Sequence, residues 1–69
     1  MAAGAVVSQT RTRELAYRQT GGLHVTLLWQ ESDDGLFVVV LDEAAGTILR
    51  IGAQPQNALD VFRHPFAHV

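Results

Sequence analysis

The chain has 69 residues, of which 48% are hydrophobic and 17% charged, and its formal net charge is −2. This composition is typical of one globular domain and argues against an intrinsically disordered chain. There is no cysteine, which excludes disulfide bonds and cysteine-based zinc sites. A nucleic-acid-binding domain normally has a basic surface, and this acidic chain holds only five Lys and Arg residues. We expect neither a cofactor nor a nucleic-acid partner.

The N-terminal segment 1–12 has no periodic pattern, and we expect a flexible tail before a single domain at 13–69. The apolar start from Met1 to Val7 is too short for a signal peptide and lacks a charged beginning. No stretch reaches the roughly 18 apolar residues of a membrane span. We therefore expect a cytoplasmic protein with no membrane partner.

The next segments predict an antiparallel β-meander. A weak alternation over 13–19 predicts an edge strand, and the two glycines at 21–22 supply the turn after it. Segments 23–30 and 36–42 are rich in Val, Leu, Phe and Trp, and the polar stretch 31–35 between them is typical of a turn. These segments predict a hairpin with two strongly apolar strands.

A register that sets Gln30 opposite Leu36 places the largest apolar side chains on one face of this hairpin. Side chains alternate along each strand, so Trp29 then lies opposite Phe37. We predict that this core face consists of Val25, Leu27, Trp29, Phe37, Val39 and Leu41.

The residues 44–46 predict a three-residue loop, a type I turn with a glycine bulge, that sets Glu43 opposite Thr47. A four-residue loop would turn Arg50 into the core, where an unpaired charge is costly. With the bulged loop, the core face also receives Leu49 and Ile51.

A helical period follows. Pro55 is suited to the first turn of a helix, and Pro65 disfavours helical geometry at the residue before it. A helix this short is marginal alone, and we expect it to dock on the core face through Leu59 and Phe62, with Phe66 holding the tail to the same core. The predicted fold class is α+β: a three- to four-stranded antiparallel meander with one short C-terminal helix packed on one face.

The second face of the predicted sheet is unusually apolar for a solvated surface. An exposed apolar patch with a polar rim often marks an interface, and so small a domain needs support beyond its own core. We therefore predict a non-enzymatic protein–protein interaction module, a homodimer or an accessory subunit. Alternatively, the chain covers this face itself, through its N-terminal segment or a curled sheet. The predicted interface residues are Leu28, Leu36, Val38, Val40, Ile48 and Arg50.

Candidate catalytic residues are few. The predicted register sets His24 opposite Asp42, which would orient a general base. The only hydroxyls near this pair are those of Thr26 and Thr47, and a chain this small encloses little of a pocket. A polar cross-strand pair is the simpler interpretation of these two residues, and we predict no enzyme activity.

Two other classes of function stay open. Asp60, His64 and His68 are spaced four apart, as metal ligands on a helix face can be, although Pro65 interrupts that helix. They would make a metal- or ligand-responsive regulator, while a polar helix end is the simpler interpretation. A nucleic-acid-binding accessory protein would need a concentrated surface of Arg11, Arg13, Arg18 and Arg50.

Three stretches of the chain, 22–29, 38–43 and 58–67, can be compared as one pattern, VTLLW followed by ALDVFRHPFA, of which His64-Pro65-Phe66-Ala67 is the most distinctive part. Over about 14–68 the chain resembles a group of small uncharacterised actinobacterial proteins. The resemblance implies a high-GC bacterial cytoplasm. It implies no activity and no site residue.

Overall fold

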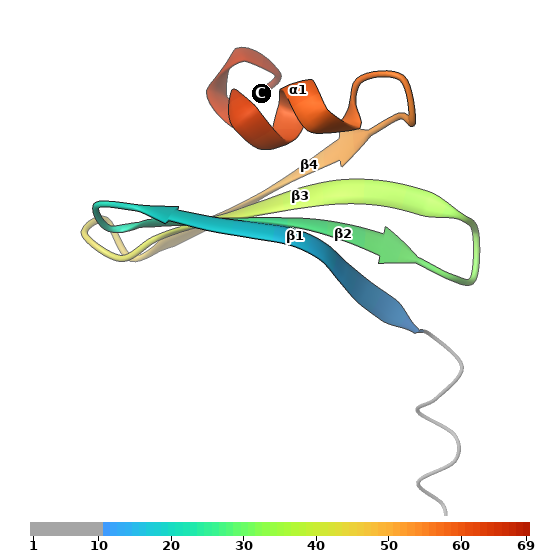
Figure 1. The fold of residues 1–69 in the computed structure, drawn as a ribbon. Helices are drawn as coiled ribbons and strands as arrows, with labels where there is room; N and C mark the ends of the chain where they lie inside the picture. Colours follow the sequence, from blue (N-terminus) through green and yellow to red (C-terminus); the bar gives the residue numbers. More distant parts are fainter. Residues whose placement is uncertain (1–10) are drawn as a thin grey trace, which may run out of the picture.

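The antiparallel meander predicted from the sequence is confirmed. A computed structural model describes residues 11–69, and most of the predicted tail, 1–10, lies outside the described residues. Four strands pair in the order of the chain, each antiparallel to the next, and a short α-helix and a 3₁₀ helix follow (Figure 1). The elements are β1 (Thr12–Thr20), β2 (Leu23–Gln30), β3 (Gly35–Asp42), β4 (Thr47–Ala53), α1 (Ala58–Arg63) and η2 (Pro65–Ala67).

The core lies between one face of the sheet and α1 (Figure 1). Its fully buried side chains are small: the largest that are wholly shielded from solvent are three valines. The C-terminal segment therefore covers one side of a two-layer domain, with only a thin apolar layer between. The buried residues of this core cluster are Val25, Leu27, Val38, Val40, Ile51, Ala58 and Val61.

The predicted register of β2 with β3 is wrong by one residue. Gln30 lies opposite Gly35, so that the loop has four residues, 31–34. The turn explains the difference, because Asp34 adopts a positive φ of 59° and the Asp33 carboxylate accepts a hydrogen bond of 2.9 Å from the Gly35 amide. Asp is among the residues that tolerate this conformation, and the side-chain bond stabilises it.

The predicted register of β3 with β4 is wrong by one residue as well. Asp42, not Glu43, lies opposite Thr47, and the loop again has four residues. Gly46 has the positive φ that a glycine turn requires, 68°, and its amide donates to the Asp42 carbonyl over 2.8 Å. The two errors compensate each other, so β4 keeps its predicted alignment with β2 even though β3 between them is shifted by one residue. As predicted, Ile51 lies on the core face and Arg50 points away from it.

The helix begins later than predicted, at Ala58 instead of Pro55. The Asn57 side chain accepts a hydrogen bond of 2.8 Å from the Gln54 amide and so closes a separate turn before the helix. The end is as predicted, since α1 stops at Arg63 and Pro65 opens η2.

The docking residues of the helix also differ from those expected. Ala58 and Val61 are buried, Phe62 is half-buried, and Leu59 is 57% exposed. Phe66 is exposed as well, and Pro65 takes the buried place at the C-terminal segment. Ala58 and Val61, three residues apart, form the side of the helix that packs on the sheet, and Leu59 lies outside that side, so the expected docking through Leu59 is wrong. Within residues 11–69, no helix has the length and apolar character that crossing a membrane requires.

Trp29 was predicted to lead the core but lies near the end of the sheet. It is opposite Leu36, is half-buried, and its Nε1 donates to an Asp34 carboxylate oxygen over 2.6 Å. The Arg13 guanidinium lies 5.9 Å from the centre of its ring system. Trp29 therefore anchors the β2–β3 turn more than it fills the core.

Candidate interaction surface

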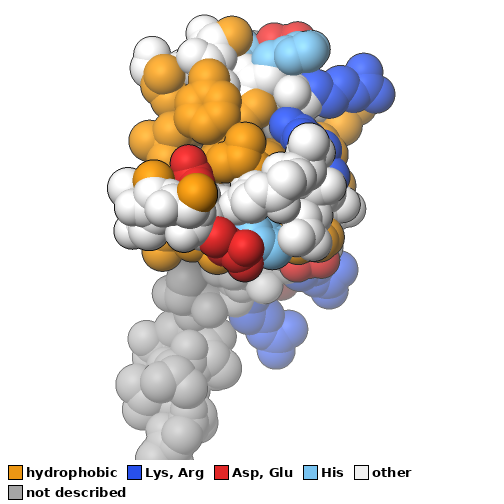
Figure 2. Space-filling view, turned by 90° about the vertical axis from the view of Figure 1, so that its left-hand side faces the viewer, with side chains coloured by type: hydrophobic (Ala, Val, Ile, Leu, Met, Phe, Trp, Pro, Cys, Tyr) orange, Lys and Arg blue, Asp and Glu red, His pale blue; other side chains and the backbone are white. Residues whose placement is uncertain are grey.

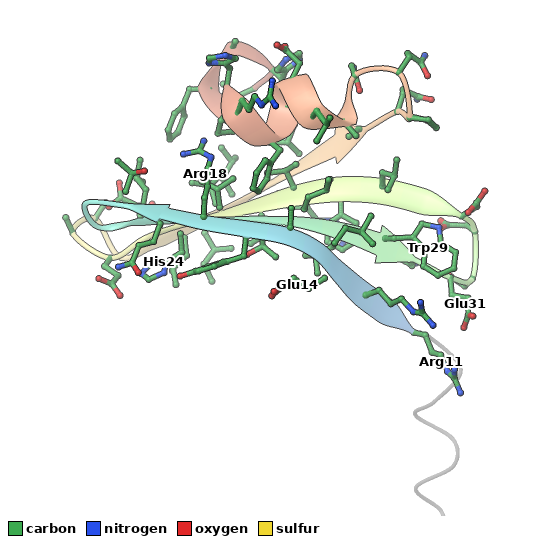
Figure 3. All side chains as sticks on the ribbon, viewed as in Figure 1. Arg11, Glu14, Arg18, His24, Trp29 and Glu31 are labelled. Carbon is green, nitrogen blue, oxygen red and sulfur yellow. The ribbon has the colours of Figure 1, made fainter. Side chains whose placement is uncertain are left out.

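The face of the sheet opposite α1 is uncovered by any helix or strand of residues 11–69 (Figure 1). We call it the open face. Figure 3 shows His24 and Glu14 on this side, whereas Arg18 points toward the helix. Cross-strand partners share a face, so the register assigns the open face its apolar members: Tyr17, Leu28, Phe37, Val39, Leu41 and Ile48.

Half of the predicted interface residues are not on this face. Val38 and Val40 are buried under the helix and Leu36 packs beside them, because the register of β3 differs by one from the predicted one. Their assignment to the second face is wrong. Leu28, Ile48 and Arg50 do lie on the open face, because the two register errors cancel for β2 and β4.

The open face is apolar at its centre and exposed at its margin. Leu28, Val39 and Leu41 are half-buried by their neighbours on the sheet. At the margin, Ile48 is 72% exposed and Tyr17 48% exposed. Exposing a large apolar side chain such as Ile48 to water to this extent is unfavourable. Covering this surface would therefore lower the free energy of the protein.

Arg50 lies across the middle of the open face. Its guanidinium carbon is 4.0 Å from the centroid of the Phe37 ring, a close cation–π contact. Its Nη2 also reaches the Gln30 side-chain oxygen at 3.5 Å. The stacked guanidinium keeps its charge at the surface while its stem shields the apolar centre.

One end of the open face carries a chain of three polar side chains. His24 Nε2 lies 2.8 Å from a Glu43 carboxylate oxygen, and the Tyr17 hydroxyl lies 2.6 Å from His24 Nδ1. A carboxylate only accepts, so Nε2 donates to Glu43; in the neutral ring, Nδ1 then accepts from the tyrosine. The arrangement orients the imidazole firmly, on a flat surface that does not exclude water.

The predicted His24–Asp42 pair is absent from this arrangement. Asp42 lies opposite Leu23, on the helix side, and its carboxylate accepts from the Ala45 amide over 3.1 Å. Glu43 in the turn takes the place beside His24 that the predicted register assigned to Asp42.

The C-terminal candidates come together in part. His68 Nε2 lies 2.7 Å from an Asp60 carboxylate oxygen, while His64 forms the boundary between α1 and η2. In residues 11–69, no three His, Cys, Asp or Glu side chains form a group that could hold a metal ion. The pair joins the end of the chain to α1.

The arginines are spread over the molecule. Arg11 lies 3.8 Å from Glu31, at the end of the sheet where Trp29 lies (Figure 3). Arg18 is on the helix side of the sheet and Arg50 on the open face. The four arginines considered for nucleic-acid binding thus lie on no common surface.

The open face contains four apolar residues that the sequence analysis did not assign to it: Tyr17, Phe37, Val39 and Leu41. The signal that could have found the three in β3 is the turn. Asp33-Asp34-Gly35 suits a tight loop in which one Asp bonds to the backbone and the next adopts positive φ. In β1, the register shifts between Glu14 and Ala16, and such a bulge has no clear sequence pattern.

Comparison with models of protein families, with curated proteins and with solved structures found no match.

Proposed function

We propose that the chain is a non-enzymatic interaction module whose open face pairs with a second copy of itself. The observation that carries the proposal is the contiguous apolar surface of the open face, with Ile48 72% exposed at its margin. Within residues 11–69, the core cluster has only seven buried residues besides Pro65, three of them valines that are wholly shielded. A small domain with so thin a core gains stability from assembly.

The size of the open face supports a pair of copies. Four strands about 4.8 Å apart, with about eight residues rising roughly 3.3 Å each, cover about 500 Å². Two such faces together bury on the order of 1,000 Å², which is where specific interfaces begin. We therefore expect a weak dimer, with dissociation in the micromolar range.

Charge supports a second copy as the occupant. Glu14, Leu28, Phe37 and Gly52 lie in one row across the sheet, and the Arg50 guanidinium lies over Phe37 in that row. A two-fold axis parallel to the strands sets β1 of one copy across from β4 of the other and each row across from itself. Glu14 of one copy then approaches Arg50 of the other, so the face is complementary to itself.

The proposal is tested by an Ile48→Asp variant, analysed by size-exclusion chromatography with light scattering. Two copies of Ile48 are buried in a symmetric pair, and burying one such side chain contributes about 1.5–3 kcal/mol. We expect the dissociation constant to rise at least tenfold.

A matched control is Leu59→Asp, because Leu59 is another exposed aliphatic residue (57% exposed, against 72% for Ile48) and lies on α1, away from the open face. It makes the same change of charge and polarity and should leave the dimer intact. A wild-type chain that is strictly monomeric up to millimolar concentration would refute the proposal. Equal weakening by both variants would also refute it.

A further inference from the structure

A cavity of about 360 Å³ lies on the helix side of the sheet, between the C-terminal segment and the end of β1 and β2. Figure 2 views this end of the molecule, where hydrophobic side chains gather between the C-terminal segment at the top and the hairpin turns below, with basic side chains beside them. The volume is in the lower part of the range for small-molecule sites. The residues that line it are Arg18, Leu23, Val25, Arg63, His64, Pro65, Phe66 and Ala67.

Arg18 is held in place at this cavity by the end of α1. Its Nε and Nη2 donate to the Phe62 carbonyl over 3.2 and 2.9 Å, and Nη2 also donates to the Arg63 carbonyl over 3.0 Å. The guanidinium lies 5.5 Å from the Phe62 ring centroid. Its position is fixed before any ligand arrives, which lowers the entropic cost of binding one. Its Nη1 has no acceptor in the part of the chain that the structure describes.

The cavity is lined by basic residues, and no acidic residue lies among them to balance their charge. Arg63 lines it and, among residues 11–69, forms neither an ion pair nor a side-chain hydrogen bond. No Asp or Glu is among the lining residues, which include two arginines, on a chain whose net charge is −2. Such a local concentration of positive charge favours an anion.

Apart from His64, the rest of the wall is apolar. Leu23 and Val25 form the sheet side, and Pro65, Phe66 and Ala67 form the side of the C-terminal segment. Phe66, which was expected to pack into the core, is 57% exposed and leaves its ring available to the cavity. An apolar wall with a few charged groups at one side is the usual composition of a site for an amphipathic small molecule.

We propose that this cavity binds a small amphipathic carboxylate. The carboxylate accepts hydrogen bonds from Arg18 Nη1 and from Arg63, because a planar guanidinium suits the planar, two-oxygen acceptor. The hydrocarbon part lies against Leu23, Val25 and the exposed Phe66 ring. The site is independent of the proposed dimer, because it lies on the opposite face of the sheet.

The test uses the full chain, with octanoate as the probe and 1-octanol as its uncharged equivalent, followed by two-dimensional NMR of the backbone amides. We expect octanoate to shift the amides of Leu23, Phe66 and Ala67 in a saturable manner, and to bind at least tenfold more tightly than octanol. Arg63→Gln should weaken octanoate binding about tenfold, since hydrogen bonds to charged groups are the stronger ones. The octanol affinity of this variant should be unchanged.

The matched control is Arg11→Gln, which removes the same charge from an exposed position at the other end of the sheet. Equal weakening by Arg63→Gln and Arg11→Gln would mean that only the overall charge acts, and would overturn the proposal. Shifts confined to Phe37 and Val39 would place the probe on the open face, which would also overturn it. The absence of saturable shifts at millimolar octanoate would have the same consequence.

Discussion

Val38 and Val39 are adjacent valines that face opposite sides of the sheet. Val38 is completely buried between the strands and α1, whereas Val39 is half-buried on the open face. Side chains alternate along a strand, so one residue of register decides which of the two is in the core. Which of the two valines is buried therefore identifies the register of β3.

We expect Val38→Ala to lower the free energy of unfolding by about 2 kcal/mol, because a buried cavity adds to the lost apolar burial. Val39→Ala should cost less than about 1 kcal/mol in the monomer, since part of that side chain is already in water. Urea denaturation followed by tryptophan fluorescence measures both, at a protein concentration low enough to keep the chain monomeric. A larger loss for Val39→Ala would contradict the register described above.

The amino-acid pattern of β3 explains why its register could not be predicted. All residues from Leu36 to Leu41 are apolar, so the strand has no alternation that marks an inner and an outer face. The sequence pattern favours pairing Trp29 with Phe37, the two largest side chains of this hairpin. The turn chemistry of Asp33 and Asp34 overrode that preference, and the faces of β2 and β4 were correct only because two errors cancelled.

Among the elements, α1 is the one most dependent on its contacts. It has six residues, too few to be stable alone, and it buries only Ala58 and Val61. Arg18 of β1 binds its last carbonyls, which have no partner within the helix itself. The hydrogen bonds of one arginine thus join the C-terminal segment to the far edge of the sheet.

We expect Arg18→Gln to loosen α1 while the sheet stays folded, with a local loss of about 1–2 kcal/mol. Amide hydrogen exchange measures this effect, and the amides of Val61 and His64, which bond to carbonyls in and before the helix, should exchange about tenfold faster or more. The matched control is Arg13→Gln, an arginine on the same strand whose guanidinium lies 5.9 Å from the centre of the Trp29 ring system, toward the other end of β1 from Arg18. Unchanged exchange in α1 would show that apolar packing alone holds the helix.

The existence and the end of this helix were predictable, because Pro65 gives a strong signal. Its start and its buried side were not. The Asn57 side chain closes a turn that competes with the helix, and the buried residues Ala58 and Val61 are smaller than Leu59, which was expected to dock. The cavity beside Arg18 could not be predicted either, since it joins residues more than forty positions apart.

At the scale of the whole molecule, the proposed dimer depends on how the open faces of its two copies are oriented relative to each other. Glu14 and the stacked Arg50 guanidinium lie in the same row across the sheet, and their opposite charges favour one orientation of the two copies. With the two-fold axis along the strands, the proposed dimer would contain two equivalent contacts between Glu14 and Arg50.

This geometry predicts the behaviour of two charge-reversed variants. Glu14→Arg and Arg50→Glu should each fail to self-associate, because both contacts then bring like charges together. An equimolar mixture of the two should form a heterodimer, in which both contacts join opposite charges. Light scattering of the separate and mixed samples measures the effect. Self-association of either variant at wild-type affinity would contradict the orientation, and so would a mixture that stays monomeric.

The bulge in β1 has a consequence for how far assembly can proceed. β1 and β4 are the two edges of the sheet, and an unprotected edge can recruit further strands without limit. The shift between Glu14 and Ala16 interrupts the regular spacing of hydrogen-bonding groups along β1, which has arginines on both sides of the irregularity. Pairing through a face about a two-fold axis closes at two copies, whereas pairing through an edge grows into a fibril. If the open face pairs as proposed, the bulge would let the domain associate through that face and still remain a finite particle.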